Sequence, residues 1–337
     1  MFMRKVFVLI IFFGVLSVGW YTWSLRPLDP RSEIRRTVKI APGSSVAVIA
    51  DLLEEKGVIR SSFAFKIYVK IHGIQTALQA GSFVLRPSMS ATEVAEALRT
   101  GIAAEAIITI PEGYTVLDMD RLLASRGIIT AGQLKQCANN CDFSSFPFLP
   151  KKRTDFAMRG GRVEGYLYPD TYFVVVDGFS PKFFLERLLS TFEKHVLQVF
   201  KEDLAHSKRS LHEIVTMASL IEKETRTEEE RPIVSGILWK RYDAGKGLDV
   251  DAAVRYVLEK PTDALTTTDL NINSPYNIRK FRGLPPGPIA SPSISSIRAA
   301  LFPKKTEYWY YLHGINGEIH YAVPNEEHNV NRYKYLR

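Results

Sequence analysis

The sequence predicts an α+β protein with an N-terminal transmembrane helix, a small α+β domain and a larger α+β domain. Three observations support this prediction: an uncharged run near the start of the chain, a strand–turn–helix pattern that occurs twice, and a long amphipathic helix that precedes a loop rich in proline and glycine. Short strands mixed with helices are typical of folds in which helices cover small sheets. The 337 residues are enough for two domains.

The first element is an apolar run at residues 6–25 that holds no charged side chain and is about as long as a membrane-spanning helix. Trp20, Tyr21 and Trp23 stand at its far end, where aromatic residues favour a membrane interface. A cleaved signal peptide is the competing interpretation, but the run ends in aromatic rather than small residues. Basic residues flank both sides, so charge does not decide the orientation. The very short tail favours export of the domain that follows.

We therefore predict a cytoplasmic tail at residues 1–5, a signal anchor at 6–25 and a linker at 26–36. The net charge of +8 favours anionic partners, among which nucleic acid, lipid head groups and an acidic wall polymer all qualify. No zinc-finger spacing, RNA-recognition signature or arginine-rich arm is present in the sequence, so a nucleic-acid partner is not predicted.

An internal repeat organises the next part of the chain. The positions of Ile40, Gly43, Val46, Leu52, Leu53, Gly57, Val58 and Ile59 recur seventy residues later as Ile110, Gly113, Val116, Leu122, Leu123, Gly127, Ile128 and Ile129. Each copy predicts a strand, a turn, an amphipathic helix and a glycine cap. Between the copies we expect a helix at 63–71, a strand at 81–85 and a helix that begins after Ser90. Structural duplication explains the repeat better than two ligand sites.

The two cysteines, Cys137 and Cys141, lie one helical turn apart, which leaves a local disulfide and two unpaired thiols as open alternatives. A metal site would need two further ligands that no neighbouring residue supplies. Glu326 and His328 do not belong to any familiar ligand motif. No metal and no cofactor is predicted.

The segment 160–176 is rich in tyrosine, valine and phenylalanine and predicts strands that are interrupted at Pro169. In a strand, Tyr166 and Tyr172 would share a face. Such a face can stack on sugar rings, but aromatic residues also fill cores, and the pattern favours the core. Glu164 and Asp170 are acidic groups close to this surface.

A helix from Ser210 onward contains the first candidate for chemistry. Ser210 and Glu213 have capping-box spacing, and apolar residues recur along one face as far as Ile221. At about 100° per residue, Glu222 falls on that face, whereas Glu224 points away. A carboxylate on a buried face should have a raised pKa and hold a proton for acid catalysis. Alternatively the apolar face ends at Ile221 and a solvated charge run follows, which the spacing alone slightly favours.

The last third of the chain contains a stiff loop at 273–293, whose prolines and glycines exclude regular structure and which is suited to hold binding residues. Before it, Asp251 can line a cleft or cap a helix. After it, a short helix at 295–301 and a hairpin joined at residues 314–317 are predicted.

Five motifs in this order resemble the endolytic murein transglycosylases, the YceG-like family. They are ASLIEKET (218–225), VEGYLYPDTY (163–172), SPYN (274–277), GLPPGPIASPS (283–293) and EEHN (326–329). The resemblance covers nearly the whole chain. It implies a small LysM-like domain at 37–105 and a YceG-like catalytic domain at 106–337.

The resemblance implies a single-pass inner-membrane enzyme whose catalytic domain faces the periplasm. Such an enzyme cuts nascent peptidoglycan strands between N-acetylmuramic acid and N-acetylglucosamine, leaves 1,6-anhydromuramoyl ends and so can end strand growth. Glycan strands and inner-membrane lipid are the implied partners, and peptidoglycan synthases are further candidates.

The catalytic acid implied by the family motif is its first glutamate, Glu222. It would protonate the glycosidic oxygen and then accept the proton of the muramic C6 hydroxyl as that hydroxyl attacks C1. The expected substrate-binding residues are Glu164, Tyr166, Asp170, Tyr172, Ser219, Asp251, Tyr276, Asn277, Pro286 and Ser291.

Two departures from the family pattern are local. Arg226 stands where the family often has glycine. In the segment 248–254 Asp251 matches the family pattern, but the glutamine, serine or threonine, and threonine positions do not, which puts substrate contacts from that loop in doubt. A hydrolase that uses Glu164 or Asp170 as its second carboxylate and a non-catalytic wall-binding anchor are the alternative functions.

Overall fold

The computed structural model describes residues 14, 16–30, 32, 34–101, 105–151, 160–176, 179–260 and 262–336. The chain divides into an N-terminal unit (residues 1–107 and 173–179) and a C-terminal unit (residues 108–172 and 180–337). Both units combine helices with two-stranded sheets, as the predicted α+β class requires.

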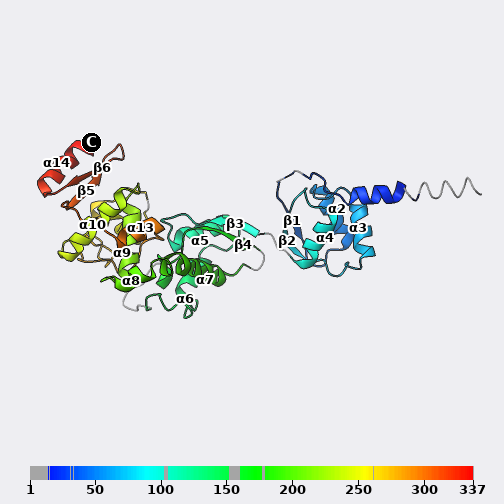
Figure 1. Ribbon diagram of the computed structural model, residues 1–337, viewed down its shortest axis with the longest axis horizontal. Coiled ribbons are helices and arrows are strands. Elements are labelled where there is room, and N and C mark those ends of the chain that lie inside the picture. The colour runs from blue at the N-terminus through cyan, green and yellow to red at the C-terminus, as the bar shows by residue number, and fades with distance from the viewer. Residues whose placement is uncertain are drawn as a thin grey trace, which may run out of the picture. The chain divides into compact units, whose positions relative to one another are not determined.

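The elements along the chain (Figure 1) are β1 (Arg36–Ile40), α2 (Val46–Glu55), α3 (Ser62–Ile71), β2 (Gly81–Leu85), α4 (Ala91–Thr100), β3 (Glu105–Thr109), α5 (Val116–Ser125), α6 (Gln133–Asn140), η1 (Gly161–Val163), β4 (Thr171–Val175), α7 (Pro181–Phe192), η2 (Glu193–Leu197), α8 (Lys201–His206), α9 (Leu211–Glu224), α10 (Glu230–Asp243), α11 (Asp251–Leu258), α12 (Thr267–Leu270), α13 (Ile294–Leu301), β5 (Tyr310–His313), β6 (Ile319–Ala322) and α14 (Asn325–Tyr335).

The predicted tail at 1–5 and much of the predicted anchor lie outside the described residues. Residues 16–24 are helical. Within the described part of the chain, no helix is both long enough and apolar enough to span a bilayer.

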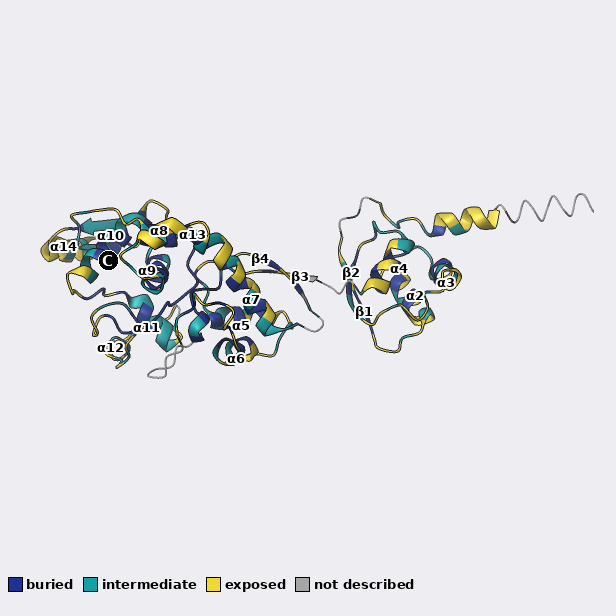
Figure 2. Ribbon diagram, turned by 60° about the horizontal axis from the view of Figure 1, so that its bottom comes forward, coloured by how far each residue is buried: buried dark blue, intermediate teal, exposed yellow. Residues whose placement is uncertain are grey.

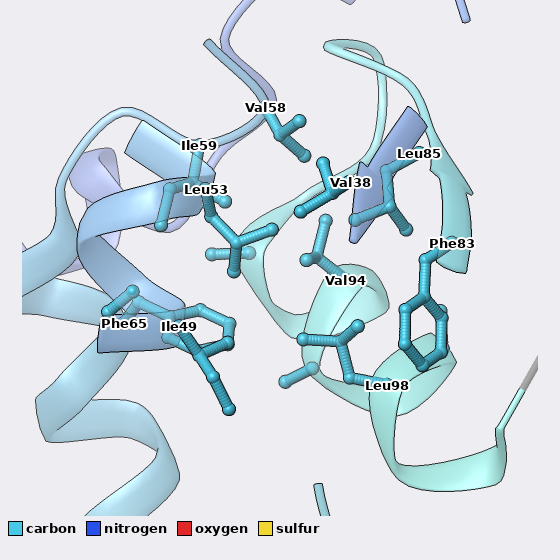
Figure 3. Packing of buried hydrophobic residues seen from close by; sticks show 14 of the residues in the cluster. Val38, Ile49, Leu53, Val58, Ile59, Phe65, Phe83, Leu85, Val94 and Leu98 are labelled. Atoms are coloured by element: carbon cyan, nitrogen blue, oxygen red, sulfur yellow. The ribbon is translucent and has the colours of Figure 1, made fainter. Parts of the chain in front are cut away.

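The N-terminal unit is built on β1 and β2, which pair antiparallel with Arg36 opposite Leu85. Val38 in β1 and Phe83 in β2 belong to one hydrophobic core (Figure 3). Helices α2, α3 and α4 contribute the rest of this core, with side chains such as Leu53 and Leu98. The strand at 81–85 is confirmed, and so is the capping box of α4.

The internal repeat is a structural duplication. In the first copy β1 leads through a turn at Gly43 into α2, and in the second β3 leads through a turn at Gly113 into α5. Both glycines have positive φ, +79° and +74°, which other residues adopt only at a cost. The copies differ in their partner strands, because β1 pairs with β2 and β3 pairs with β4. The boundary predicted at residues 105 and 106 falls within β3.

The predicted strand before Pro169 is wrong. Residues 161–163 form a 3₁₀ turn, and the only strand in this segment is β4. Gly161 and Gly165 have φ of +64° and +82°, which is incompatible with extended backbone. Tyr166 therefore does not share a strand face with Tyr172. Of the two alternatives for the cysteines, the structure has the disulfide, between Cys137 and Cys141 at the end of α6.

The C-terminal unit is organised around α9, which packs against α10, α11 and α13. Six of its apolar side chains are completely buried, and Figure 2 shows the helix largely in the buried colour. The predicted hairpin is confirmed as β5 and β6, which pair with Tyr310 opposite Ala322. Lys240 of α10 donates to the carbonyl of Glu307 at 2.9 Å, and His313 of β5 contacts Glu230 of α10 at 3.2 Å. The hairpin is therefore fastened to α10.

A glycine in α10 permits this attachment, and we expect its replacement to destabilise the protein. A Cβ at Gly236 would collide with the backbone carbonyl of Lys304, in the segment that leads to the hairpin. Gly236→Ala should lower the free energy of unfolding by about 1–3 kcal/mol through overpacking. At an exposed helix position the same change normally raises the free energy of unfolding by about 1 kcal/mol, because alanine has the higher helix propensity. Gly245→Ala, which meets no neighbour but has φ of +64°, measures backbone strain alone. A higher denaturation midpoint for Gly236→Ala would contradict the close approach.

Candidate active site

A cavity of about 300 Å³ in the C-terminal unit brings together side chains that are far apart in the sequence. It lies among α5, α9 and α11 and the loop that precedes α13. Its lining consists of Thr115, Leu117, Asp118, Arg121, Lys135, Glu164, Lys223, Glu224, Asp251, Ala252, Arg255, Tyr256, Glu259 and Ile289. Two of these residues, Glu164 and Glu224, are carboxylic acids with strongly altered proton affinity.

Glu224 is the last residue of α9, and it lines the cavity. The Tyr311 hydroxyl of β5 donates a hydrogen bond to Glu224 Oε2 at 2.9 Å. Burial raises the pKa of Glu224 to about 7, the charge of Asp251 acts in the same direction, and the Tyr311 hydrogen bond opposes the rise. Near neutral pH this group can therefore both release and accept a proton.

Glu164 follows the 3₁₀ turn and is almost fully buried, with 1% of its surface exposed. The backbone N–H of Val116 donates to Glu164 Oε1 at 3.0 Å, and the Tyr256 hydroxyl of α11 donates to Oε2 at 3.1 Å. Burial raises the pKa of Glu164 to about 7 despite these hydrogen bonds. Because the donors come from α5 and α11, Glu164 also ties two walls of the cavity together.

Charged groups of both signs surround these acids. Arg121 and Lys135 approach Glu259 at 3.7 Å and 3.9 Å, distances too long for good hydrogen bonds. Asp251 lines the cavity and pairs with Arg279 at 2.6 Å. The arrangement suits a polar ligand with several hydroxyl or charged groups.

Glu222 lies on the side of α9 that faces α13, and it does not line the cavity. Its Oε2 accepts hydrogen bonds from Ser293 N at 2.9 Å, Ser293 Oγ at 2.5 Å and Ser296 Oγ at 2.7 Å. Its Oε1 lies 3.8 Å from the Arg231 guanidinium of α10, and the side chain is 8% exposed. The predicted buried face is therefore observed, and α10 and the start of α13 pack against Glu222.

The predicted binding residues separate into two groups. Glu164 and Asp251 line the cavity with Glu224, whereas the other predicted residues are absent from its lining. Tyr166 and Tyr172 are core residues, and Tyr166 Oη makes a hydrogen bond with His212 Nδ1 at 2.9 Å. Asp170 is exposed beside β4.

The remaining predicted residues hold the 273–293 loop in place. Ser219 Oγ of α9 accepts a hydrogen bond from Ile289 N at 3.0 Å, which sets Ile289 at the cavity wall. Ser291 exchanges backbone hydrogen bonds with the 113–114 turn, and the Pro286 carbonyl pairs with His212. Asn277 Nδ2 donates to the carbonyls of Leu270 and Ile272. Tyr276 is buried and packs against Tyr256 at 5.3 Å between ring centroids.

The sequence does not predict Glu224, Tyr256 or Tyr311 as site residues. Glu224 stands in the same EKE motif as Glu222, but helical periodicity places it off the apolar face of α9. Nothing in the sequence indicates the two tyrosines, since Tyr311 is 87 residues from Glu224 and Tyr256 is 92 residues from Glu164. Only tertiary packing brings these pairs together.

Comparison with known proteins gives consistent matches over most of the chain. The model of the YceG-like family matches residues 38–334. An endolytic murein transglycosylase of Bacillus subtilis is 32% identical over 321 residues, which cover 93% of this chain and 88% of that protein. One of Streptococcus pneumoniae R6 is 29% identical, and the match covers 97% of this chain but 64% of that longer protein.

A solved structure agrees with the sequence matches. The crystal structure of a putative yceG-like protein of Listeria monocytogenes superposes with a TM-score of 0.61 at 30% identity, and covers 89% of this chain and 99% of that one. The extent of the family match, together with the similarity to the Bacillus protein, decides the assignment. This chain therefore belongs to the YceG-like family.

Proposed function

We propose that this protein is an endolytic murein transglycosylase that cuts glycan strands between N-acetylmuramic acid and N-acetylglucosamine and leaves 1,6-anhydromuramoyl ends. Its relatives carry that name, and the cavity offers what the reaction needs. The observation that supports the proposal most is Glu224, an acid in the cavity wall whose pKa is raised to about 7.

The reaction needs one group that acts first as an acid and then as a base. Protonated Glu224 donates its proton to the glycosidic oxygen as the bond from C1 to that oxygen breaks. The muramic C6 hydroxyl then attacks C1, and its proton passes to Glu224, which restores the starting state. Because Tyr311 donates to Oε2, the transferred proton resides on Oε1.

This proposal places the chemistry on Glu224, whereas the sequence had indicated Glu222. The resemblance implies the first glutamate of the motif, Glu222, whereas the positions of the two side chains support the second, Glu224. Three hydrogen bonds from Ser293 and Ser296 hold Glu222 between helices, and its side chain does not line the cavity. The assignment to Glu222 remains a prediction that a matched pair of variants tests, as set out in the Discussion.

Hydrolysis is the second candidate function, and one observation favours it: Glu164 and Glu224 line the same cavity. Glycosidases that hydrolyse their substrate place two carboxyl groups around the bond. Asp170, the other predicted partner, is exposed and outside the cavity. Mass spectrometry of products from purified strands decides, because a hydrolysed end contains one more water than an anhydro end.

The wider setting also remains a proposal. The uncharged run at 6–25 supports a single-pass anchor in the inner membrane, with the larger domain in the periplasm. The N-terminal unit corresponds in position to the LysM-like domain predicted at 37–105, which would bind glycan or position the catalytic domain. Membrane lipid and peptidoglycan synthases are the proposed partners besides the strands, and cleavage near a synthase would end strand growth.

The rate of cleavage is expected to fall as the pH rises above about 7. The pKa of Glu224 is raised to about 7, so the protonated acid predominates below that pH and is depleted above it. Each further pH unit should reduce the rate roughly tenfold. Initial rates of anhydromuramoyl formation from purified strands between pH 5 and pH 9 measure this decrease, which is the alkaline limb of the pH–rate profile.

Two variants test whether Glu224 causes the alkaline limb of the pH–rate profile. Tyr311→Phe removes a hydrogen bond that lowers the pKa of Glu224, so its limb should move to higher pH. Glu164→Gln removes the other titrating acid and should leave the limb where it is. A rate that stays flat from pH 7 to pH 9, or a limb that disappears in Glu164→Gln, would contradict the assignment.

A further inference from the structure

A second cavity adjoins the one that contains Glu224, and the proposed reaction does not use it. The two cavities share Asp118, Arg121 and Lys223 in their linings, so they are neighbours at these side chains. The adjoining cavity measures about 520 Å³. Its other lining residues are Glu112, Gly113, Tyr114, Leu122 and Ser125.

Two cations at the junction have donors available for a ligand. Lys223 is exposed, and within the described part of the chain it makes no hydrogen bond or ion pair. Arg121 lies 3.7 Å from Glu259 and 4.0 Å from Asp118, which is beyond hydrogen-bonding distance for its N–H groups. Lys223 stands between Glu222 and Glu224 in the sequence and is thus next to the proposed catalytic acid.

A carboxylate, that of Glu112, also lines this cavity. Glu112 also has no hydrogen bond or ion pair to another described residue. Partial burial and the charge of Glu222 raise the pKa of Glu112. A cationic group of a ligand would therefore stabilise the ionised Glu112 carboxylate. Gly113, the residue after Glu112, lies beside Lys223: a Cβ there would be 3.5 Å from Lys223 Nζ, an ordinary van der Waals distance.

The combination of charges restricts the ligand. A simple anion such as phosphate would be attracted by Lys223 and Arg121 but repelled by Glu112. A simple cation would meet the opposite conflict. A ligand that has both a carboxylate and an ammonium group can pair with the two cations and with Glu112, and a short peptide has this chemistry.

We propose that the adjoining cavity is a subsite for the peptide stem carried by the muramoyl residue at Glu224. Lys223 and Arg121 bind a stem carboxylate, and Glu112 binds a stem ammonium. The proposal rests on the proposed function, which places the muramoyl ring in the neighbouring cavity. The subsite makes strands with peptide stems better substrates than bare strands.

The test compares two substrates prepared from the same glycan strands, one with intact stems and one stripped by an amidase. The wild-type protein should give a higher kcat/KM with intact stems. Lys223→Ala and Glu112→Gln should each lower this preference by roughly three- to tenfold, the range of a partly exposed charged contact. Lys305→Ala and Glu202→Gln, which remove the same charges from residues outside both cavities, should keep the wild-type preference.

A binding measurement separates this proposal from the proposed function. Calorimetry compares an N-acetylmuramoyl peptide that has a free side-chain ammonium with N-acetylmuramic acid alone, neither of which contains a bond to cleave. Tighter binding of the peptide, lost in Lys223→Ala, supports the subsite even if no strand is cut. Equal binding of both ligands by the wild-type protein, or a preference that survives both substitutions, would overturn it.

Discussion

Replacing Glu224 by glutamine is expected to abolish the formation of anhydromuramoyl ends. Glutamine preserves the size of the side chain and can still accept the Tyr311 hydrogen bond, but it has no proton to donate to the glycosidic oxygen. Loss of a general acid and base typically costs about 10²- to 10⁴-fold in rate. The measurement is chromatography and mass spectrometry of products from purified strands, with wild type and variant at equal concentration.

Glu222→Gln is the matched control, because it makes the same chemical change two residues earlier on the same helix. Glu222 is enclosed by Ser293, Ser296 and Arg231. We therefore expect folded Glu222→Gln protein to cleave strands at close to the wild-type rate. Circular dichroism of both variants establishes that they are folded at the assay temperature. The reverse result, an active Glu224→Gln and an inactive Glu222→Gln, would return the catalytic role to Glu222.

Replacing Glu222 by alanine is expected to lower the stability of the fold more than it lowers the rate of cleavage. It leaves the Arg231 guanidinium, 10% exposed, without one of its two carboxylates and removes the acceptor of three hydrogen bonds at the start of α13. Breaking such a buried pair costs about 3 kcal/mol, the low end of the usual range, since Glu228 still pairs with Arg231. Thermal unfolding should begin roughly 6–12 °C lower.

Glu224→Ala provides the comparison for this stability effect. Among the described residues, Glu224 makes one side-chain hydrogen bond, to Tyr311, so its loss should shift unfolding by only a few degrees while activity disappears. The two alanine variants should thus show opposite patterns, one with low stability and measurable activity and one with near-normal stability and no activity. A Glu222→Ala protein that unfolds within about 2 °C of wild type would show that the network around Glu222 contributes little.

Local signals in the sequence predicted most of the elements around the site. The capping box at Ser210 and Glu213 was found where predicted, and α9 runs from Leu211 to Glu224. The repeat predicted the turn at Gly113, because a positive φ favours glycine at that point. These predictions succeeded because capping, helical periodicity and turn chemistry depend on residues a few positions apart.

The failures concern features that depend on contacts distant in the sequence. The segment before Pro169 has the composition of a strand, but Gly161 and Gly165 adopt positive φ where the chain packs closely against other segments. A Cβ at Gly165 would collide with Pro288, more than a hundred residues away. Strand propensity cannot register such an approach, since it reflects side-chain packing on a sheet that is not present here.

The sequence by itself determined the family, the duplicated strand–turn–helix unit and the short motif in which the catalytic acid is proposed to lie. It also determined correctly that Glu222 faces the interior of the fold. Only the tertiary structure decided what lies opposite each glutamate. Helical periodicity relates side chains to the axis of their own helix, whereas the pKa of a carboxyl group depends on what other elements place around it. Ser293 and Ser296 of the α13 segment enclose Glu222, while the cavity and Tyr311 of β5 surround Glu224.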